Sequence, residues 1–355
     1  MKISHVLIYI AALVAAVFIV YRTANHDFYT AVTVTGATPL ALSQKVPSGI
    51  RLEVTGLVKK NYRFTSSALR AFATTRIRTR ELSPGGDFLG TYIYCGIPVF
   101  NILEGVAPSF PEGSLMDTPA DFLVTFTSAS GDKRSFSYGE LLMTGDDYPP
   151  ILAYHRSELL PSKNPETYRL NSPRDPLEGL CLVAPRDNTT ARSLEHVTHI
   201  TFSIPDISAD NLPVRVKKNA CTSTAILVVD GSMVRPGSFD GVMKTVRDDW
   251  IRIGHGYGFR GISRVEGYEL RSFLERNVPD ARKDDYFLFV SCDGYRCLFS
   301  GHEIFSTASG ASMMIIDRMD GEDHPSGNLI ACTDDYFIDR SIWGVTHLVV
   351  INGSQ

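Results

Sequence analysis

Three arginines at alternate positions form the first group of side chains that could do chemistry. Arg76, Arg78 and Arg80 alternate in the segment RIRTR. On a β-strand, residues two apart point to the same face, so the three guanidinium groups would share one face. A guanidinium group can hold a phosphate or carboxylate through two parallel hydrogen bonds. The segment therefore predicts either an anion-binding row or a solvated strand face with carboxylate neighbours such as Glu81.

A glycine-rich segment, GHGYGFRG at residues 254–261, supplies the second group, and it follows Arg252 closely. Its glycines would let the backbone approach a ligand. His255, Tyr257 and Arg260 add a titrating imidazole, a phenol and a fixed cation. We expect these side chains and Arg252 to contribute to a binding site, or the segment to be a glycine-rich connection without a ligand.

Histidines also recur in the chain. His199 and His347 each end a Val-Thr-His phrase, and His196 precedes the first of them by three residues. On a strand, residues 196 and 199 would point to opposite faces, so a shared metal ion is disfavoured and a local hydrogen bond is the better explanation. The sequence contains no P-loop, nucleophile elbow, H-E-x-x-H or paired-cysteine zinc motif. No metal site is predicted, and the catalytic residues remain unknown.

Cysteine usage points to a core-stabilised protein. Six cysteines in 355 residues are too few for a scaffold built on disulfides. Cys292 and Cys297 flank a tight DGYR turn. They form either a local disulfide or two thiols.

The composition is that of a globular protein, with 44% hydrophobic and 21% charged residues, and the length suits about two domains. The net charge is -4, and neither a basic tail nor a nucleic-acid-binding motif is present. We therefore exclude nucleic acid as a partner.

The N-terminal segment from Ile3 to Tyr21 carries no charged side chain. As a helix, it nearly spans a hydrocarbon core of roughly 30 Å. A cleaved secretory signal is the alternative, but YRTANHD offers a poor cleavage site. We expect a membrane anchor at residues 1–24 with the soluble part periplasmic or otherwise extracytoplasmic, and either interpretation exports the remaining chain.

A repeat divides the exported part. The phrase RSLEHVTHITF, which starts at Arg192, returns as RSIWGVTHLVV from Arg340. Other phrases match in the same order, and the offset falls steadily from 175 residues, between Gly56 and Gly231, to 148 at this last pair. Ordered matches with progressively shorter loops indicate one module used twice. The largest shortening falls in a polar, proline-rich loop that follows Arg156.

Each copy is predicted to mix helices and strands. A strand leads to a short helix at residues 64–73 or 236–246, and another strand follows. A second helix covers residues 96–106 or 267–278, because its apolar residues recur at intervals of three and four. A hairpin with a glycine turn and two final strands complete the module. The predicted domains are 48–205 and 224–352, joined by a polar linker at 206–223.

The order of these phrases resembles a known family. YCGIPVFNILE, at Tyr94–Glu104, together with PLEGLCLVAP and RSLEHVTHI, is similar to the molybdopterin-binding domain of the sulfite oxidase family. The resemblance covers Gly49 to Ile204 well and Thr224 to Ile351 more weakly. It implies two tandem α+β domains, each of a fold that in this family binds a pyranopterin dithiolene carrying molybdenum.

The chain departs from that family at the metal. Redox-active members ligate molybdenum with a cysteine shortly after the third element, since a soft thiolate suits this metal. The corresponding segments, RIRTRELSPGG and IRIGHGYGFRG, contain no cysteine. Cys95 lies in the next element and is interpreted as a small buried residue. Arg78 or Arg252 could still hold the phosphate of a pterin.

Two functions remain open. The first is a membrane-anchored binding or assembly module that has lost the metal thiolate and serves a protein partner or a small anionic ligand. The second is a molybdopterin-dependent oxidoreductase that exchanges electrons with a membrane or periplasmic carrier. The expected cofactor is accordingly none or molybdopterin.

Overall fold

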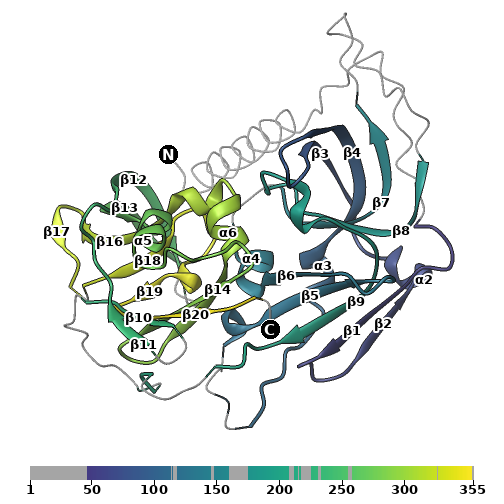
Figure 1. Cartoon of the computed structure of the whole chain (residues 1–355). Coiled ribbons are helices and arrows are strands. Elements are labelled where there is room, and N and C mark those ends of the chain that lie inside the picture. Colours follow the sequence, from purple (N-terminus) through teal and green to yellow (C-terminus); the bar gives the residue numbers. More distant parts are fainter. Residues whose placement is uncertain are drawn as a thin grey trace, which may run out of the picture. The chain divides into compact units, whose positions relative to one another are not determined.

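The computed structural model describes residues 46–112, 114, 118–144, 148–159, 175–207, 212–214, 216, 225–230, 233–254, 258–325 and 327–353 (Figure 1). One compact unit spans Lys45–Gln355. The predicted membrane anchor lies outside the described residues, as do His255 and Tyr257. Within the described ranges, no helix combines the length and apolar character needed to cross a bilayer.

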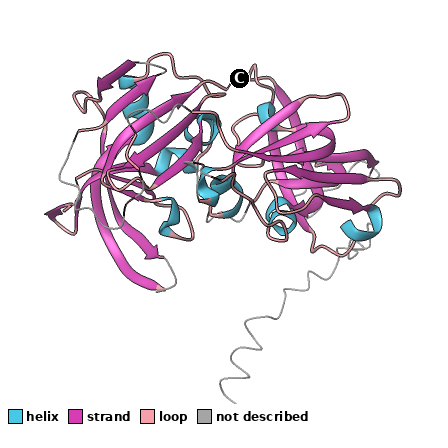
Figure 2. Ribbon diagram, turned by 90° about the horizontal axis from the view of Figure 1, so that it is seen from below, coloured by secondary structure: helices cyan, strands magenta, loops and turns pink. Residues whose placement is uncertain are grey.

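Strands make up most of the regular secondary structure of the described chain, and the helices are few and short (Figure 2). The helices are α2 (Ser66–Leu69), α3 (Val99–Leu103), α4 (Tyr138–Leu142), α5 (Leu270–Asn277) and α6 (Gly301–Ser306). Hydroxyl side chains cap the N-termini of three of these helices. Thr65, Ser137 and Ser300 each accept a hydrogen bond from a backbone amide in the first turn, which satisfies a donor that the helix itself leaves unpaired. The predicted mixed α+β class is correct.

The first half, residues 46–207, forms a nine-stranded sheet. Its strands are β1 (Arg51–Gly56), β2 (Tyr62–Thr65), β3 (Thr75–Leu82), β4 (Phe88–Pro98), β5 (Leu123–Ser128), β6 (Lys133–Ser137), β7 (Ile151–Glu158), β8 (Asp175–Val183) and β9 (Leu194–Ser203). The main path runs β2-β1-β9-β8-β7-β4-β3, and β5 joins it by pairing with β9 and β6. β1 lies parallel to β9, and the other described pairs are antiparallel.

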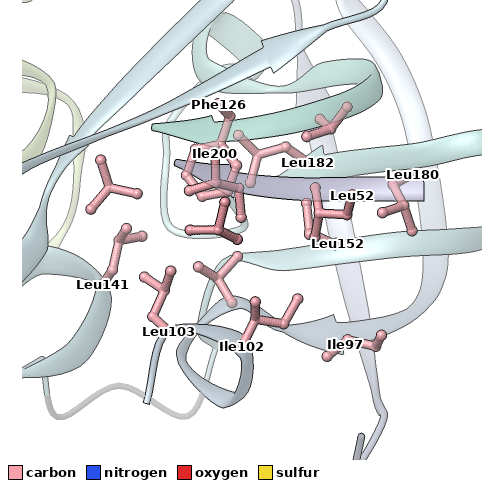
Figure 3. Close-up of a cluster of buried hydrophobic side chains, with 14 of the residues drawn as sticks. Leu52, Ile97, Ile102, Leu103, Phe126, Leu141, Leu152, Leu180, Leu182 and Ile200 are labelled. Carbon is pink, nitrogen blue, oxygen red and sulfur yellow. The ribbon is translucent and has the colours of Figure 1, made fainter. Parts of the chain in front are cut away.

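Aliphatic side chains from strands and helices fill the core of the first half (Figure 3). Leu52 from β1, Leu152 from β7 and Ile200 from β9 are all fully buried. Ile102 and Leu103 add the apolar side of α3. Burying one such side chain contributes roughly 1.5–3 kcal/mol, so these residues hold the sheet and its helices together.

The second half, residues 225–353, contains two sheets. The five-stranded sheet has the order β11-β10-β20-β14-β15, and the six-stranded sheet runs β12-β13-β16-β18-β19 with β17 on β16. The strands are β10 (Leu227–Asp230), β11 (Met233–Pro236), β12 (Lys244–Ile253), β13 (Phe259–Glu269), β14 (Tyr286–Ser291), β15 (Arg296–Ser300), β16 (Met313–Met319), β17 (Glu322–Asp323), β18 (Leu329–Cys332), β19 (Ile342–Trp343) and β20 (Val345–Ile351).

The pairing pattern of the first half recurs in the second. β10 pairs with β11 and lies parallel to β20, as β1 does with β2 and β9. β14 pairs with β15 and β20, as β5 does with β6 and β9. The path β12-β13-β16-β18-β19 repeats β3-β4-β7-β8-β9. Apart from the short strand β17 on β16, each strand pairing in the second half therefore has a counterpart in the first.

The two sheets of the second half separate at one backbone position. Gly344 (φ 67°) separates β19 from β20, while its counterpart at the same offset, His196 (φ 53°), lies inside the continuous strand β9. Both residues adopt the left-handed conformation that bends a strand locally. In the first half, the continuous strand β9 joins all the strands into one sheet. In the second half, the break at Gly344 leaves β19 in one sheet and β20 in the other.

Two sequence expectations about single elements are wrong. The helix predicted at residues 236–246 is absent, and the segment forms a turn followed by β12. Gly241 has φ 74°, and Pro236 and Gly237 interrupt any helix, so the breakers outweigh the capping pattern. After its hairpin, each copy has three strands where two were expected. The additional strand is β8 in the first copy and β18 in the second.

Candidate functional site

The arginine row of β3 lies on the exposed face of the sheet. Arg76, Arg78 and Arg80 are exposed, whereas Ile77 and Thr79 between them are buried. No carboxylate pairs with the three arginines among the residues that the structure describes. The predicted common face is therefore present, and its guanidinium groups are open to solvent or to an anion.

Glu81, the expected neighbour of the row, faces away from it. Its carboxylate accepts a hydrogen bond from Thr79 Oγ1 at 2.9 Å. It also accepts from the buried phenol of Tyr94, which in turn interacts with the guanidinium of Arg156. Burial and then the charge of Glu81 raise the pKa of Tyr94, so the phenol stays protonated and donates. The Arg156 guanidinium stacks over Tyr92 at 5.3 Å from the ring centroid.

Cys181 lies beside this network but does not supply a thiolate. Its side chain is 8% exposed within the cluster that contains Ile77 and Tyr94. Burial, and then the negative charge of Glu195, raise the pKa of the thiol to about 12. A protonated, buried thiol is a poor ligand and a poor nucleophile. Cys95, predicted to be buried, is instead half-buried, and it lies within β4.

The second half carries no counterpart of the Tyr94 network. The strand registers match Tyr94 with Val265, since these residues pair with Arg156 and Met319 respectively. They also match Cys181 with Leu329. The corresponding cluster is Trp250, Val265, Met314, Ile316, Leu329, Ala331 and Ile338. An apolar core thus occupies the place where the first half holds a phenol, a carboxylate and a guanidinium.

The glycine-rich segment 254–261 connects β12 to β13. A Cβ at Gly254 would lie 2.4 Å from Ile338 Cγ1, and Gly258 has φ 69°, so packing and turn geometry account for both glycines. Arg252 is half-buried, and its Nε has no hydrogen-bond partner within the described residues. Arg260 is exposed. Arg252 lies near the end of β12, and Arg260 lies near the start of β13. The β3 arginines belong to the other half of the chain.

The recurring histidines make local contacts. His199 Nδ1 lies 2.9 Å from Thr198 Oγ1, and His347 Nδ1 lies 2.9 Å from Thr346 Oγ1. The predicted local hydrogen bond is therefore confirmed at both positions. Cys292 is disulfide-bonded, but Cys297 is a free, buried cysteine, so these two residues are not bonded to each other.

A buried ionic centre, not anticipated as a site, lies where the two halves meet. In the first half, Arg192 donates to Asp187 from Nε at 2.8 Å and from Nη2 at 2.7 Å, and to Glu140 from Nη1 at 2.9 Å. In the second half, Arg340 donates to Asp335 from Nε and Nη2, both at 2.7 Å, and also to Glu303. Both arginines are at most 3% exposed. We call these six residues the paired ionic centre.

Two serines link the halves of this centre reciprocally. Ser137 Oγ donates to Glu303 at 3.2 Å, and Ser300 Oγ donates to Glu140 at 3.0 Å. Each serine also caps its own helix, α4 or α6, by accepting from the backbone amide of the adjacent glutamate. The two helices lie next to each other between the halves (Figure 1). These two serine–glutamate bonds therefore form a reciprocal pair across the halves.

Backbone contacts repeat the same reciprocity. Asn188 N donates to Ser306 O at 2.9 Å, and Tyr336 N donates to Met143 O at 3.1 Å. Isolated bridges join Asp187 to Thr307 and Thr144 to Asp335. The arginines also stack on aromatic rings, Arg192 on Phe136 and Arg340 on Phe299. The sequence carries a trace of this centre, because Glu140 and Glu303 occupy matched positions of the two copies, as Arg192 and Arg340 do.

Burial controls the protonation of the centre. It raises the pKa of Glu303 to about 7, although Arg340 opposes this shift. It raises the pKa of Asp335 as well, again against the influence of Arg340. The neighbouring carboxylates raise the pKa of Arg340 despite its burial, so the guanidinium remains charged. The centre can therefore take up a proton near neutral pH, and it does so on a carboxylate.

Comparison with known proteins identifies no family. No family model matches the chain, and no curated protein matches it. Among solved structures, the sulfane dehydrogenase SoxCD from Paracoccus pantotrophus is similar, with a TM-score of 0.31 and 15% sequence identity. The match covers 70% of this chain and 58% of that chain, so it spans less than two thirds of SoxCD.

Proposed function

We propose that this protein is a membrane-anchored, exported binding and assembly module made of two sulfite-oxidase-like copies, at 48–205 and 224–352. The observation that carries the proposal is the paired ionic centre. It joins matched residues of the two halves, and it commits helices α4 and α6 to holding them together. A rigid tandem presents two faces at a fixed geometry, which is what an assembly module requires.

Removing a charge from this centre would be costly, which supports a fixed rather than a loose tandem. Glu140 and Glu303 are 4% and 2% exposed, and each accepts from an arginine and a serine. A buried carboxylate that loses its partner destabilises a protein by about 3–5 kcal/mol. Separating the halves would break the bonds from Ser137 to Glu303 and from Ser300 to Glu140, while each arginine would keep the carboxylates of its own half.

The chemistry of the thiols supports a binding role over molybdenum redox chemistry. A soft metal of this kind prefers a thiolate ligand. Burial raises the pKa of Cys181, Cys297 and Cys332. Glu81, the carboxylate nearest to the family's ligand position, is engaged by Thr79 and Tyr94.

The apolar segment Ile3–Tyr21 supports export and anchoring. The disulfide at Cys292 agrees with an oxidising compartment. Fractionation of native cells, followed by an alkaline wash and mass spectrometry of the N-terminus, tests this part. Recovery in the washed membranes with an intact N-terminus is expected. A mature N-terminus near residue 25 would establish a cleaved signal instead.

Cofactor analysis of the full chain, purified from its native host, tests the functional proposal. Molybdenum is measured by elemental analysis, and pterin by fluorescence after extraction. We expect substoichiometric molybdenum and no sulfite-oxidising activity. If molybdenum and pterin are both near one per chain, and Arg78→Ala or Arg252→Ala removes them, the oxidoreductase interpretation replaces this one.

A further inference from the structure

A cleft of about 750 Å³ opens beside the paired ionic centre. One wall is the solvent-facing side of β5 and β6, which contributes Thr125, Lys133 and Ser135. The other wall is the turn that precedes β14, which contributes Arg282 and Lys283. Arg192 and Ser300 of the ionic centre also line it. The cleft is therefore built from both halves.

The lining of the cleft is basic, although the chain as a whole has a net charge of -4. Lys133, Arg134, Arg282, Lys283 and Arg192 contribute five cations, against the carboxylate of Asp284. We call this feature the basic cleft. Such a concentration of one sign in a recess attracts the opposite charge more strongly than the same residues on a flat surface.

Three of these cations are not engaged by carboxylates. Arg134 donates to the backbone oxygens of Ala191 and Lys133, both at 2.7 Å. Lys133 and Lys283 are exposed and take part in no ion pair within the described part of the chain. The other two are paired with carboxylates: Arg192 with Glu140 and Asp187, and Arg282 with Asp285 at 3.0 Å. The unneutralised charge thus lies at the rim, where a ligand would enter.

Hydroxyl groups supply the uncharged part of the lining. Thr125 Oγ1 and Ser135 Oγ lie 2.7 Å apart across the β5–β6 pair. Hydroxyl groups can donate to anionic oxygens and can reorient to suit them. A wall of hydroxyls with lysine and arginine at its edge is suited to a molecule that carries several anionic oxygens.

The polar lining is not shared by the two halves, because the corresponding face of the second half is apolar. Leu288 pairs with Leu298 where Thr125 pairs with Ser135. These leucines are fully buried, and Ile207 and Leu212 from the segment between the halves pack against their cluster. The chain itself covers the apolar face of one half, whereas the matched face of the other is polar and open.

A second difference between the halves lies at the floor of the basic cleft. His302 of α6 lines the cleft, and the matched residue of α4 is Gly139. His302 Nε2 lies 3.2 Å from Asp284 Oδ1. Burial, and then the charge of Arg192, lower the pKa of His302, so the ring is neutral at pH 7. A neutral imidazole leaves the charge of the site to the lysines and arginines.

We infer that the basic cleft binds an organic polyanion that carries phosphate or carboxylate groups. The volume exceeds that needed for a single phosphate, and it suits a molecule with two or more anionic groups. The inference deepens the proposed binding function and rests on it. The two fail separately, because cofactor content is measured on the same preparation without any titration of the cleft.

Calorimetric titration of the full chain in detergent tests the inference, with inorganic pyrophosphate and citrate as probes for phosphate and carboxylate groups. The variant is Lys133→Gln with Lys283→Gln. The matched control is Lys59→Gln with Lys60→Gln, which removes the same charge from an exposed turn outside the cleft. We expect at least one probe to bind saturably, and the cleft variant to lose about tenfold or more in affinity while the control loses less than about twofold.

Three outcomes decide the matter. Binding weaker than about 1 mM for both probes overturns the inference. Equal losses in the cleft variant and the control reduce the effect to net charge and also overturn it. A loss confined to the cleft variant supports it, and the probe that binds more tightly identifies the anionic group. Molybdenum and pterin near one per chain, with cleft binding intact, would instead overturn the proposed function alone.

Discussion

Replacing Arg340 with methionine tests the paired ionic centre most directly. Methionine retains much of the apolar stem but removes the hydrogen bonds to Asp335 and Glu303. Both carboxylates would remain buried, with side chains 3% and 2% exposed. We expect the free energy of unfolding to fall by about 3–5 kcal/mol at pH 8, because two buried anions lose the cation that they share.

The loss should depend on pH, which separates it from the effect of a packing defect. Without Arg340, the pKa values of both carboxylates rise further, since the guanidinium lowers them in the native protein. Protonation near pH 5.5 would then remove the uncompensated charge. We expect the destabilisation by Arg340→Met to be smaller there by about 1–2 kcal/mol. A cavity or a steric clash would cost the same at both pH values.

Urea unfolding of the full chain in detergent, followed by tryptophan fluorescence, measures these values. Both tryptophans, Trp250 and Trp343, lie in the second half and report its unfolding. Arg63→Met is the matched control, since Arg63 pairs with Glu53 at 2.8 Å but is 69% exposed. The control should cost less than about 1 kcal/mol. An Arg340→Met loss that equals the control, or that is the same at pH 8 and pH 5.5, would refute the reasoning.

Three further outcomes are expected. Glu303→Gln should flatten the pH dependence of the free energy of unfolding, measured by urea unfolding at several pH values. The pKa of Glu303 in the folded protein is about 7, above the ordinary value of 4.5, so the protonated side chain stabilises the fold below pH 4.5. As the pH rises from 4.5 through 7, this contribution of on the order of 3 kcal/mol is lost. Ser137→Ala and Ser300→Ala should each cost about 1–2 kcal/mol in the same assay, because each removes a helix cap and a bond to the other half, and unequal losses would contradict the reciprocity. Cys181 should resist iodoacetamide at pH 8 in the folded chain and react once unfolded, and rapid labelling of the native thiol would contradict its burial and raised pKa.

The sequence predicted the elements whose residues repeat or alternate. The β3 strand followed from the alternation of Arg76, Arg78 and Arg80, and the hairpins followed from their glycine turns. The helix at residues 236–246 failed because a capping pattern carries less free energy than the glycines and proline beside it. β8 was missed because its Gly179 and the preceding proline-rich segment are typical of a loop, and its pairing with β7 and β9 is not visible locally.

The candidate site was only partly accessible from sequence. The common face of the β3 arginines needed nothing beyond the strand period, so it could be predicted. The Tyr94 network could not, because Glu81, Tyr94 and Arg156 come from three strands whose register is set by pairing. The paired ionic centre had a readable trace in matched arginines and glutamates. What the repeat could not convey was that these residues face each other across the two halves.

A tandem arrangement explains how one fold could hold both a rigid centre and an open polar cleft whose matched face in the other half is apolar. In a symmetric pair of identical chains, every surface residue occurs twice, so a polar face and its apolar counterpart could not coexist. Here the matched positions differ, with Ser135 against Leu298 and Gly139 against His302, while the residues of the ionic centre are kept in both halves. Covalent linkage frees the outer faces to differ because the contact between the halves no longer depends on them. On this argument, substitutions of Lys133 or Lys283 in the basic cleft should change ligand binding and leave unfolding unchanged. Substitutions in the paired ionic centre should weaken both, since the cleft is lined by both halves.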